Sequence, residues 1–320
     1  MIKRVATICL IVIQILSVSS CNRIMDEKSD IKKFYELIDA DIEATTSCLF
    51  FTDPHLNDNN EMFQRHMGYV ESLYNKLPLE FCLSGGDWLN SGDINLQAIE
   101  KLKFIRDDVY ARFGNSIYHI LGNHDTNYQG RLDEISPPNS GLLSHATIVD
   151  LMFSRQRESY YSFTCNNARF YIFDTGIDWY PQIDNFKREQ LHWFAKELLL
   201  NDDDNIVLAM HIFTNDLKTP VDFSKHIMLI SEAYNNRTTV SINKMIYDFS
   251  EAKGCVSCVL CGHCHADFIN LDYSIPVVGT TQLKQGDIST FDLCVFNWND
   301  RVLNLIRIGA GSDRVVHMPS

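Results

Sequence analysis

The sequence is short of basic residues. Its 320 residues contain 28 Lys and Arg against 41 Asp and Glu, which gives a net charge of −13 at neutral pH. A protein that binds nucleic acid without sequence preference neutralises phosphates with Lys and Arg, so we expect no nucleic-acid partner. A phosphorylated substrate remains compatible with this charge, because a bound metal ion can be the dominant local charge.

The sequence also lacks internal repeats, low-complexity tracts and a clear domain linker. A composition of 45% hydrophobic and 22% charged residues is ordinary for a globular protein and provides enough apolar chain for a sizeable core. We expect one domain over residues 46–320. Residues 21–45 are predicted to form a polar tether and a first helix, because helical periodicity begins at residue 31.

The apolar run near the N-terminus is too short for a comfortable membrane span. It covers residues 5–18, follows two basic residues and leads to Ser19-Ser20-Cys21. Small residues directly before a cysteine resemble a bacterial lipobox. We therefore expect residues 1–20 to be a lipoprotein signal peptide, Cys21 to be lipidated, and the protein to be an exported, membrane-anchored lipoprotein of the cell envelope. An ordinary secretory signal and an uncleaved anchor are the alternatives.

The cysteines do not favour a disulfide framework. Ten are present, of which Cys9 belongs to the signal and Cys21 to the lipid. Several of the other eight lie in apolar, strand-like runs, and free cysteine behaves as a small buried hydrophobe. We expect mostly buried thiols. Four are spaced like an iron–sulfur ligand run (Cys255, Cys258, Cys261 and Cys264), but an extended strand cannot wrap a cluster.

The first half of the chain alternates between strands and helices. Apolar runs at 47–52, 79–83 and 116–121 are typical of buried strands, and amphipathic helices are predicted at 61–77 and 95–113. Such alternation favours a parallel sheet with helices on its faces.

The second half is less regular. Residues 126–158 and 216–239 break the pattern as two irregular insertions that could form substrate walls. Further strands are predicted at 160–163, 168–173, 206–210 and 255–260, helices at 185–200 and 242–252, and antiparallel strands at 274–278, 291–297 and 302–308, with a turn at Asn299-Asp300.

Polar residues follow five of the predicted strands at the point where each strand ends. The stretch Gly122-Asn123-His124-Asp125 delivers an amide, an imidazole and a carboxylate together. In open α/β sheets, ligands bind at the carboxyl edge of the strands. The full set is Asp53, His55, Asp87, Asn123, His124, His211, His263 and His265.

These residue types indicate a metal centre. Carboxylate, imidazole and amide oxygen together suit divalent transition metals such as Mn, Fe, Zn or Ni. Seven good ligands are too many for one ion. Two ions about 3.5–4 Å apart, bridged by one carboxylate, would use all of them.

With these blocks in hand, the chain resembles the calcineurin-like metallophosphoesterases, whose pattern is D-x-H, G-D, G-N-H-[DE], a lone H and G-H-x-H. All five blocks are present in order: Asp53-Pro54-His55, Gly86-Asp87, Gly122-Asn123-His124-Asp125, His211 and Gly262-His263-Cys264-His265. The resemblance implies an α/β fold, a four-layer αββα sandwich of two mixed β-sheets flanked by helices. Gln190 to Trp193 and Arg307 to Gly309 also resemble family stretches, more weakly.

The resemblance also implies roles for these residues. Asp53, His55 and His265 would hold one ion. Asn123, His211 and His263 would hold the other, and Asp87 would bridge the two. A hydroxide shared by the ions would attack phosphorus in line. His124 would protonate the leaving alkoxide, and Asp125 would orient His124.

Departures from the family pattern narrow the function. Purple acid phosphatases have a tyrosine ligand three residues after the bridging aspartate, where this chain has Asn90. Protein phosphatases have a phosphate-binding arginine where this chain offers Ser91. We expect hydrolysis of a phosphomonoester or phosphodiester, on a small molecule or a lipid headgroup. The alternatives are an inactive binding or scaffold lipoprotein on the same fold, and a pyrophosphatase or cyclic-nucleotide phosphodiesterase; substrate and oligomeric state stay open.

Other candidate residues have simpler interpretations. His119 lies inside a predicted strand and is expected to be a core histidine, and Trp88 is expected to pack in the core. His145 and His226 lie in the two insertions, from which they could reach a substrate.

Overall fold

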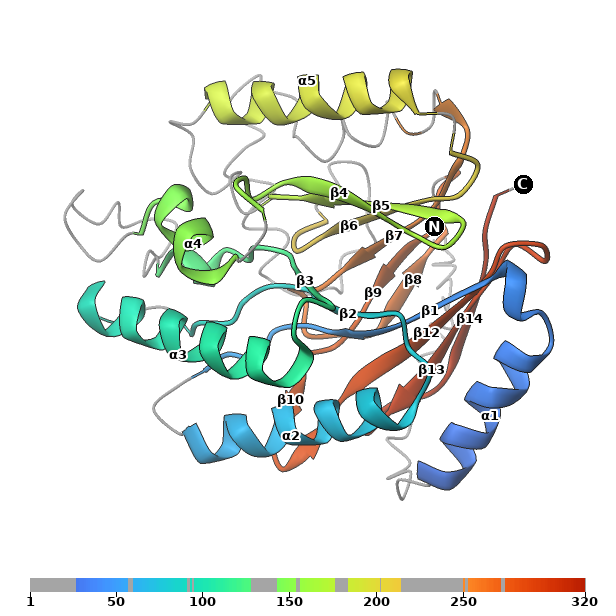
Figure 1. Cartoon of the computed structure of the whole chain (residues 1–320), viewed down its shortest axis with the longest axis horizontal. Coiled ribbons are helices and arrows are strands. Elements are labelled where there is room, and N and C mark those ends of the chain that lie inside the picture. Colours follow the sequence, from blue (N-terminus) through green and yellow to red (C-terminus); the bar gives the residue numbers. More distant parts are fainter. Residues whose placement is uncertain are drawn as a thin grey trace, which may run out of the picture.

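The computed structural model contains two six-stranded sheets that pack face to face, with helices on their outer faces (Figure 1). It describes residues 27–56, 60–90, 93, 95–127, 143–153, 156–175, 184–201, 203–213, 250, 253–271 and 274–319. The predicted four-layer αββα sandwich of two mixed sheets is confirmed. None of the helices in these ranges combines the length and the apolar composition needed to cross a bilayer.

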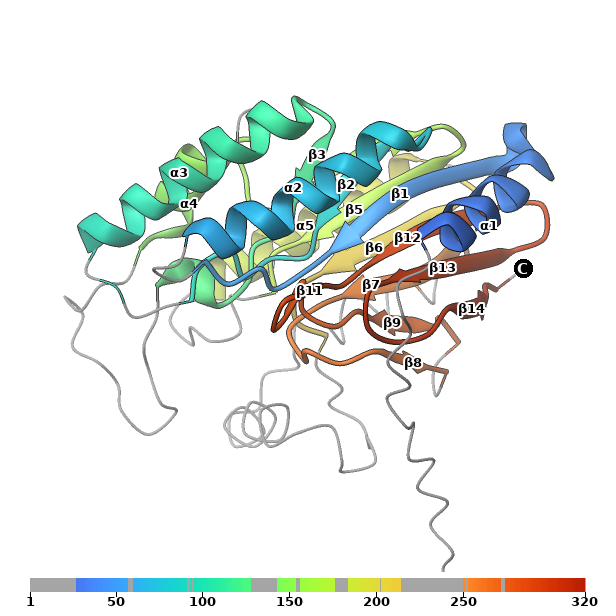
Figure 2. The same ribbon diagram turned by 90° about the horizontal axis from the view of Figure 1, so that it is seen from below.

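The first sheet contains both the first strand of the described chain, β1, and the last, β14. Its strand order is β14-β13-β12-β1-β2-β3, in which β1, β2 and β3 are parallel and β12, β13 and β14 are antiparallel to their neighbours. The strands are β1 (Thr45–Phe51), β2 (Phe81–Ser84), β3 (Ile117–His119), β12 (Phe291–Asn297), β13 (Val302–Ile308) and β14 (Arg314–His317). Three helices cover it: α1 (Glu27–Asp39), α2 (Asn60–Lys76) and α3 (Asn95–Phe113) (Figure 2).

The second sheet has the order β4-β5-β6-β7-β9-β8, with β5, β6, β7 and β9 parallel. Its strands are β4 (Tyr161–Cys165), β5 (Ala168–Phe173), β6 (Ile206–Met210), β7 (Val256–Cys261), β8 (Phe268–Asn270) and β9 (Val277–Gly279). Helix α5 (Asp184–Leu200) covers its outer face (Figure 1). The smaller elements are η1 (Ile42–Ala44), η2 (His124–Thr126), α4 (His145–Met152), β10 (Lys284–Gln285) and β11 (Ile288–Ser289).

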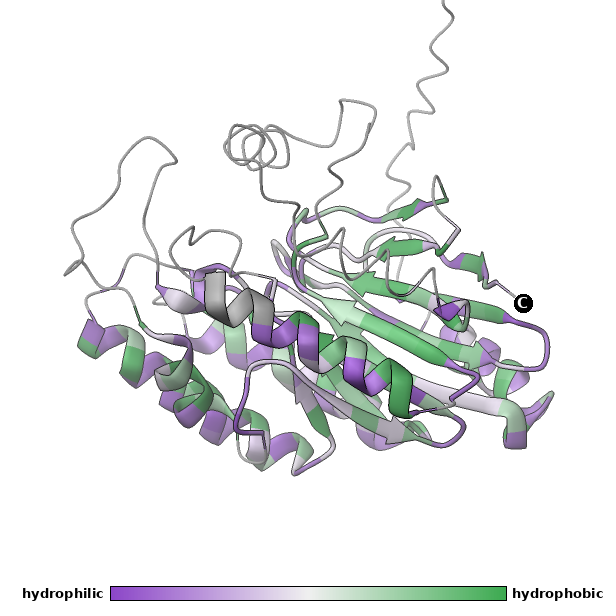
Figure 3. Ribbon diagram, turned by 90° about the horizontal axis from the view of Figure 1, so that it is seen from above, coloured by the Kyte–Doolittle hydropathy of each residue, from purple (hydrophilic) through white to green (hydrophobic). Residues whose placement is uncertain are grey.

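Strand β1 shows why the chain forms layers. All seven of its residues are buried, and successive side chains point to opposite faces. Leu49 and Phe51 pack with the helices, while Cys48 and Phe50 pack between the two sheets. Figure 3 shows the strands mostly apolar and the helices carrying their polar residues on one side. A strand buried on both faces is a continuous apolar run, which is the pattern the sequence shows.

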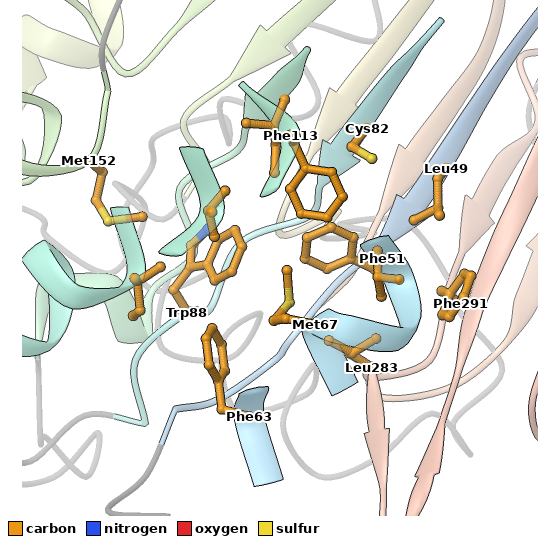
Figure 4. Packing of buried hydrophobic residues seen from close by; sticks show 14 of the residues in the cluster. Leu49, Phe51, Phe63, Met67, Cys82, Trp88, Phe113, Met152, Leu283 and Phe291 are labelled. Carbon is orange, nitrogen blue, oxygen red and sulfur yellow. The ribbon is translucent and has the colours of Figure 1, made fainter. Parts of the chain in front are cut away.

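The apolar layer between the first sheet and its helices extends to the loop that follows β2. Trp88 is fully buried there and meets Phe51 edge to face, with ring centroids 5.5 Å apart (Figure 4). The prediction that Trp88 packs in the core is confirmed. This packing fixes the backbone of the residue before it, Asp87, against the core.

Most predicted elements are present, and three expectations need correction. The segment 126–158 is not wholly irregular, because α4 forms within it, capped by Ser144, which accepts a hydrogen bond from the Thr147 N–H. The strand predicted at 274–278 is β9, which is antiparallel to β8, as expected, but runs parallel to β7 on its other side. Strands β8, β10, β11 and β14 were not predicted. The insertion 216–239 and nearly all of the helix predicted at 242–252 lie outside the described residues, as do residues 1–26.

The cysteines fit the prediction of buried thiols. All eight that follow the expected lipidation site are free, and Cys48, Cys82, Cys258, Cys261 and Cys294 are buried. Cys258 and Cys261 lie in β7, so the iron–sulfur spacing falls along an extended strand. Burial raises the pKa of the Cys258 and Cys261 thiols well above the usual value, which keeps them protonated.

His119 is buried in the apolar layer, as predicted. It is 1% exposed, and its ring packs against Trp88 and Phe153. Neither ring nitrogen has a hydrogen-bond partner within the described residues. Burial lowers the pKa of His119 to about 3, because a charged imidazolium would lose its hydration there.

We expect His119 to make the folded protein less stable as pH falls. Its pKa is about 6.5 in the unfolded chain and about 3 in the fold, so the unfolded state binds the extra proton between these values. The contribution of neutral His119 to the free energy of unfolding is fully present above pH 6.5 and is lost below it. The free energy of unfolding should fall by about 2 kcal/mol between pH 7.5 and pH 5. Urea unfolding of the wild type and His119→Phe at both pH values checks this, and an equal pH dependence in the two proteins would contradict it.

Candidate metal centre

The five sequence blocks meet at one edge of the sandwich. Asp53 and His55 follow β1, Asp87 follows β2, and Asn123 follows β3 in the first sheet. His211 follows β6, and His263 and His265 follow β7 in the second sheet. The two sheets therefore contribute opposite halves of one site.

The carboxylate oxygens and histidine ring nitrogens of the site form two adjacent groups. In Asp53, His55 and His265, one ligand atom from each residue lies within 4.8 Å of the others, and the same holds for Asp87, His211 and His263. The groups are adjacent, because His211 Nε2 of the second group lies 4.0 Å from Asp53 Oδ1 of the first. Within its own group, His211 Nε2 lies 3.1 Å from Asp87 Oδ2. This grouping agrees with the division of ligands that the sequence predicts, although the role of each ligand stays a prediction.

The ring nitrogens are arranged for cation binding. The Nδ1–H of His55 donates to the Leu89 carbonyl at 3.0 Å, and that of His211 donates to the Gly85 carbonyl at 2.7 Å. Each bond fixes the ring so that Nε2 faces the site, where it can bind a metal once it is unprotonated. His55 Nε2 faces His265 Nε2 at 3.0 Å, and His265 Nε2 faces Asp53 Oδ1 at 3.1 Å. These close contacts are satisfied by a cation between the atoms, either a proton on a ring nitrogen or a bound metal ion.

Asn123 adds an amide oxygen to the second group. Its Oδ1 is buried and has no hydrogen-bond partner within the described residues. The next residue donates its backbone N–H to Asp87 Oδ1 at 2.8 Å, so Asn123 lies directly beside the Asp87 carboxylate. A buried acceptor without a partner is costly, and a metal ion would satisfy it. The residues present therefore fit two divalent ions.

The electrostatics of the site keep its carboxylates ionised. Burial opposes the charge of Asp87, but His211 and His124 outweigh it and hold the pKa of Asp87 well below the usual value. Burial would lower the pKa of His211, but Asp87 and Asp53 raise it to about 10. Without metal, a proton on His211 thus balances the carboxylates, and metal binding must displace it. Burial lowers the pKa of His263 to about 3, which leaves its imidazole neutral for coordination.

Most of these side chains stand on strained backbone. Asp53, His55, Asp87, His263 and His265 have positive φ between 44° and 67°, and they are five of the eight such non-glycine residues in the described chain. Each left-handed residue costs about 1–3 kcal/mol unless its surroundings impose the conformation. The concentration of strain here indicates that the fold holds these loops for function.

Two glycines allow the site strands to approach closely. A Cβ on Gly122 would lie 2.1 Å from Asp87 Oδ1, and a Cβ on Gly262 would lie 2.0 Å from Thr52 Oγ1. Neither distance is compatible with a side chain. Glycine in the G-N-H-[DE] and G-H-x-H blocks is therefore required by the space beside the carboxylates.

Asp125 has a role that the sequence did not suggest. Its buried carboxylate accepts backbone N–H bonds from Asp87, Trp88, Leu89 and Gly122, at 2.7 to 3.1 Å. Burial and Asp87 raise its pKa to about 7, against the N–H bonds, which favour the ionised form. Asp125 thus fixes the loop that carries Asp87. Its predicted action on His124 is not tested by these bonds.

Thr52 also supports the site. Its hydroxyl donates to Asp53 Oδ2 at 2.5 Å, and the His263 N–H donates to the same oxygen at 3.1 Å. Asp53 Oδ1 is left to face the ring nitrogens. Sequence reasoning missed Thr52, although it directly precedes the D-x-H block.

His124 occupies the rim of the site. It begins η2, its side chain is 36% exposed, and its Nε2 lies 3.9 Å from Asp87 Oδ2. The His124 and His55 rings meet edge to face, with centroids 5.2 Å apart. A partly exposed imidazole beside the ligands can reach a bound substrate, as the predicted proton donor must.

His145 lies at the start of α4, next to a strand end that the sequence did not single out. Its Nδ1 is 2.6 Å from Asp174 Oδ2, and Asp174 follows β5. Gln190 of α5 fixes Asp174 through hydrogen bonds to both its N–H and its carbonyl, which explains the weak motif around Gln190. His145 is thus bonded to the second sheet, and His226 lies outside the described residues.

Comparison with known families gives one match. The profile of the calcineurin-like phosphoesterases matches residues 46–267, which is more than half of the chain. No curated protein sequence matches.

Solved structures with a similar fold include a dimetal phosphatase from Danio rerio. It has a TM-score of 0.61 and 12% sequence identity, over 86% of this chain and 99% of that one. GAP50, the anchor in the inner membrane complex of Plasmodium, has a TM-score of 0.53 and 12% identity, over 87% and 90%. The purple acid phosphatase PPD1 of yellow lupin has a TM-score of 0.52 and 12% identity, over 85% of this chain and 54% of that one. These similarities show a common fold.

Proposed function

The chain belongs to the calcineurin-like phosphoesterase family, and we propose that it hydrolyses a phosphomonoester or phosphodiester with two divalent transition-metal ions. The observation that carries this proposal is the convergence of histidine ring nitrogens on two buried carboxylates, Asp53 and Asp87. None of the five sequence blocks is degraded. The substrate would be a phosphorylated small molecule or a lipid headgroup.

The residues around Asp87 support this chemistry. Bound divalent ions would neutralise phosphate oxygens and lower the pKa of a coordinated water. The proposed bridging role of Asp87 is supported by its contact with His211, whose Nε2 lies 3.1 Å from Asp87 Oδ2 and 4.0 Å from Asp53 Oδ1 of the other group. Asp125 holds that arrangement through the backbone of residues 87–89.

His124 would handle the proton of the leaving group. Its imidazole is partly exposed at the rim, with Nε2 3.9 Å from Asp87 Oδ2, so it can face a bound substrate. Protonation of the departing alkoxide at Nε2 would make cleavage of poor leaving groups faster. Asn90, three residues after Asp87, is not a tyrosine, so the proposal does not include a tyrosinate–ferric centre.

A different class of function is a binding or scaffold protein without turnover. The similarity to the Plasmodium anchor shows that the fold accompanies an anchoring protein as well as phosphatases. The intact ligand set favours catalysis here. A pyrophosphatase or a cyclic-nucleotide phosphodiesterase would use the same residues and differ only in the walls of the site.

We also propose that the protein is exported and tethered to a membrane through a lipid on Cys21. The basis is the sequence of residues 1–21, in which a short apolar run precedes small residues and a cysteine. Such a tether would place the site within reach of lipid headgroups.

A metal-dependent hydrolysis assay tests the proposed function. The protein is stripped with a chelator, loaded separately with Mn²⁺, Ni²⁺, Zn²⁺ or Fe²⁺, and given an aryl phosphomonoester, a bis-aryl phosphodiester, a cyclic nucleotide, pyrophosphate and phosphoethanolamine. We expect two bound ions per chain and hydrolysis only after loading. Two bound ions with no turnover on any ester would favour the scaffold, and no bound ion would reject the metal centre.

A further inference from the structure

Arg307 is a fully buried arginine that the proposed chemistry does not use. It lies near the end of β13, its side chain is 0% exposed, and it forms ion pairs with Asp267 and Asp292. Burying such ion pairs is seldom stabilising compared with apolar packing, because both charges lose their hydration. A contribution to folding stability therefore does not account for this cluster. Its position in the fold suggests another role.

The Arg307 cluster joins the two sheets. Arg307 and Asp292 are cross-strand partners on β13 and β12 of the first sheet. Asp267 belongs to the second sheet, in the loop between β7 and β8. Arg314 of β14 completes the link, since it donates to Asp292 Oδ2 and to the Gly279 carbonyl of β9, both at 2.5 Å. Figure 2 shows β13 and β14 beside β8 and β9.

From Asp267, two hydrogen bonds lead to a predicted metal ligand. Asp267 Oδ1, which accepts from Arg307, also accepts from the Thr281 N–H at 3.0 Å. The Thr281 hydroxyl then donates to the His265 carbonyl at 2.9 Å. His265 has a φ of +50°, a conformation that its own sequence does not favour. The contacts that hold its carbonyl therefore also hold its ring direction.

We propose that Arg307, Asp267 and Thr281 are positioning residues for His265, and that they set the metal affinity of the Asp53–His55–His265 group. The inference rests on the proposed function only in that the site binds metal. In the Asp87–His211–His263 group, Asp87 and His211 stand on other loops. His263 shares the loop after β7 with His265, but its N–H is held separately by Asp53 Oδ2, so the affinity of this group should depend less on this chain of contacts.

The contact between Thr281 and His265 allows a mild test. Thr281→Val keeps the side-chain shape and removes the hydroxyl, whereas Thr281→Ser restores the hydroxyl. Thr46→Val is a matched control, because Thr46 is also buried and its hydroxyl accepts from Trp298 Nε1 at the opposite end of β1. Arg307→Lys is a more severe variant that can fail to fold, and Asp267→Asn, at a partly exposed carboxylate, provides a second route.

Calorimetric titration of chelator-stripped full-length protein with Mn²⁺ supplies the readout. We expect Thr281→Val and Asp267→Asn to lower the affinity for one of the two Mn²⁺ ions by about 10- to 100-fold. This is the usual effect of removing a residue that supports a metal ligand. Thr281→Ser and Thr46→Val should bind both ions as the wild type does. In a His55→Ala background, Thr281→Val should change the affinity of the remaining ion less than twofold.

Three outcomes would overturn the inference. In the first, the affinities for both ions fall equally. In the second, Thr281→Val and Asp267→Asn leave both affinities unchanged. In the third, Thr46→Val lowers the affinity as much as Thr281→Val does. Each would make the cluster a structural link between sheets. A wild type that binds no Mn²⁺ would instead reject the proposed metal centre, so the two failures can be told apart.

Discussion

Asp87→Asn is expected to reduce hydrolysis of an aryl phosphate by about 10³-fold or more, with loss of bound metal. The substitution preserves the shape of the side chain and an acceptor for the His124 N–H, but it removes the charge that both ions would share in the proposed centre. Metal ions contribute several kcal/mol of transition-state stabilisation, and each 1.36 kcal/mol corresponds to a factor of ten in rate.

The same variant should not unfold the metal-free protein. Asp53, Asp87 and Asp125 are buried near one another, and the negative charge of Asp87 opposes ionisation of the other two. Removing it relieves that repulsion, which offsets the loss of the ion pair with protonated His211. We therefore expect the chelator-treated variant to melt near the wild type, while the increase in Tm on adding Mn²⁺ disappears.

Asp93→Asn provides the matched control, because Asp93 pairs with Lys101 at the start of α3. It should keep wild-type metal content and activity. Near-wild-type hydrolysis by Asp87→Asn would reject the bridging role, and a large loss of stability without metal would show that Asp87 serves the fold instead.

His124→Ala is expected to keep both ions and to lose rate by about 10²–10⁴-fold, the usual contribution of a positioned acid. The backbone N–H that donates to Asp87 Oδ1 survives this change, so the bridging carboxylate should stay in place. The loss should be greatest for alkyl phosphates and smallest for nitrophenyl phosphate, whose leaving group needs little protonation.

Metal analysis of the His124→Ala protein, with rates for both ester types, checks this prediction. His192→Ala, at an exposed position of α5, is the control and should behave as the wild type. Loss of an ion from His124→Ala would make His124 a ligand. An equal loss of rate on both esters would assign it to binding of the phosphate and not to the leaving group.

The positions of the site residues could be predicted because each block is local. Asp87 and His211 each end a short apolar strand, and parallel strands end at the same edge, so the sequence alone places them together. Helix α3 was predicted with its observed bounds, since its apolar residues recur regularly on one face.

The elements that were missed depend on tertiary contacts. Strand β8 has only three residues, too few for a periodic pattern. Strand β9 was predicted, but not its parallel pairing with β7, which a tertiary contact decides. Helix α4 did have a local signal, because Ser144 is a typical N-cap before an apolar stripe at Ile148, Val149 and Met152. Pro137 and Pro138 nearby favoured the prediction of a loop for the whole segment.

The finer structure of the site could not be predicted either. The left-handed backbone at Asp53, Asp87 and His265 is imposed by hydrogen bonds from other loops, such as the four that Asp125 accepts. A sequence motif identifies which atoms can bind a metal. It does not show which distant groups hold those atoms in place.

The division of the ligands between the two sheets has a consequence for how the protein matures. Asp53, His55, Asp87 and Asn123 leave the ribosome well before His211, His263 and His265. No high-affinity centre can assemble until the later strands have been synthesised and have docked onto the earlier ones. Even then the Arg307 cluster is still missing, because β13 is made last but one of all the strands. Metal capture would thus occur only in finished molecules, so an unfinished chain would carry neither cofactor nor activity.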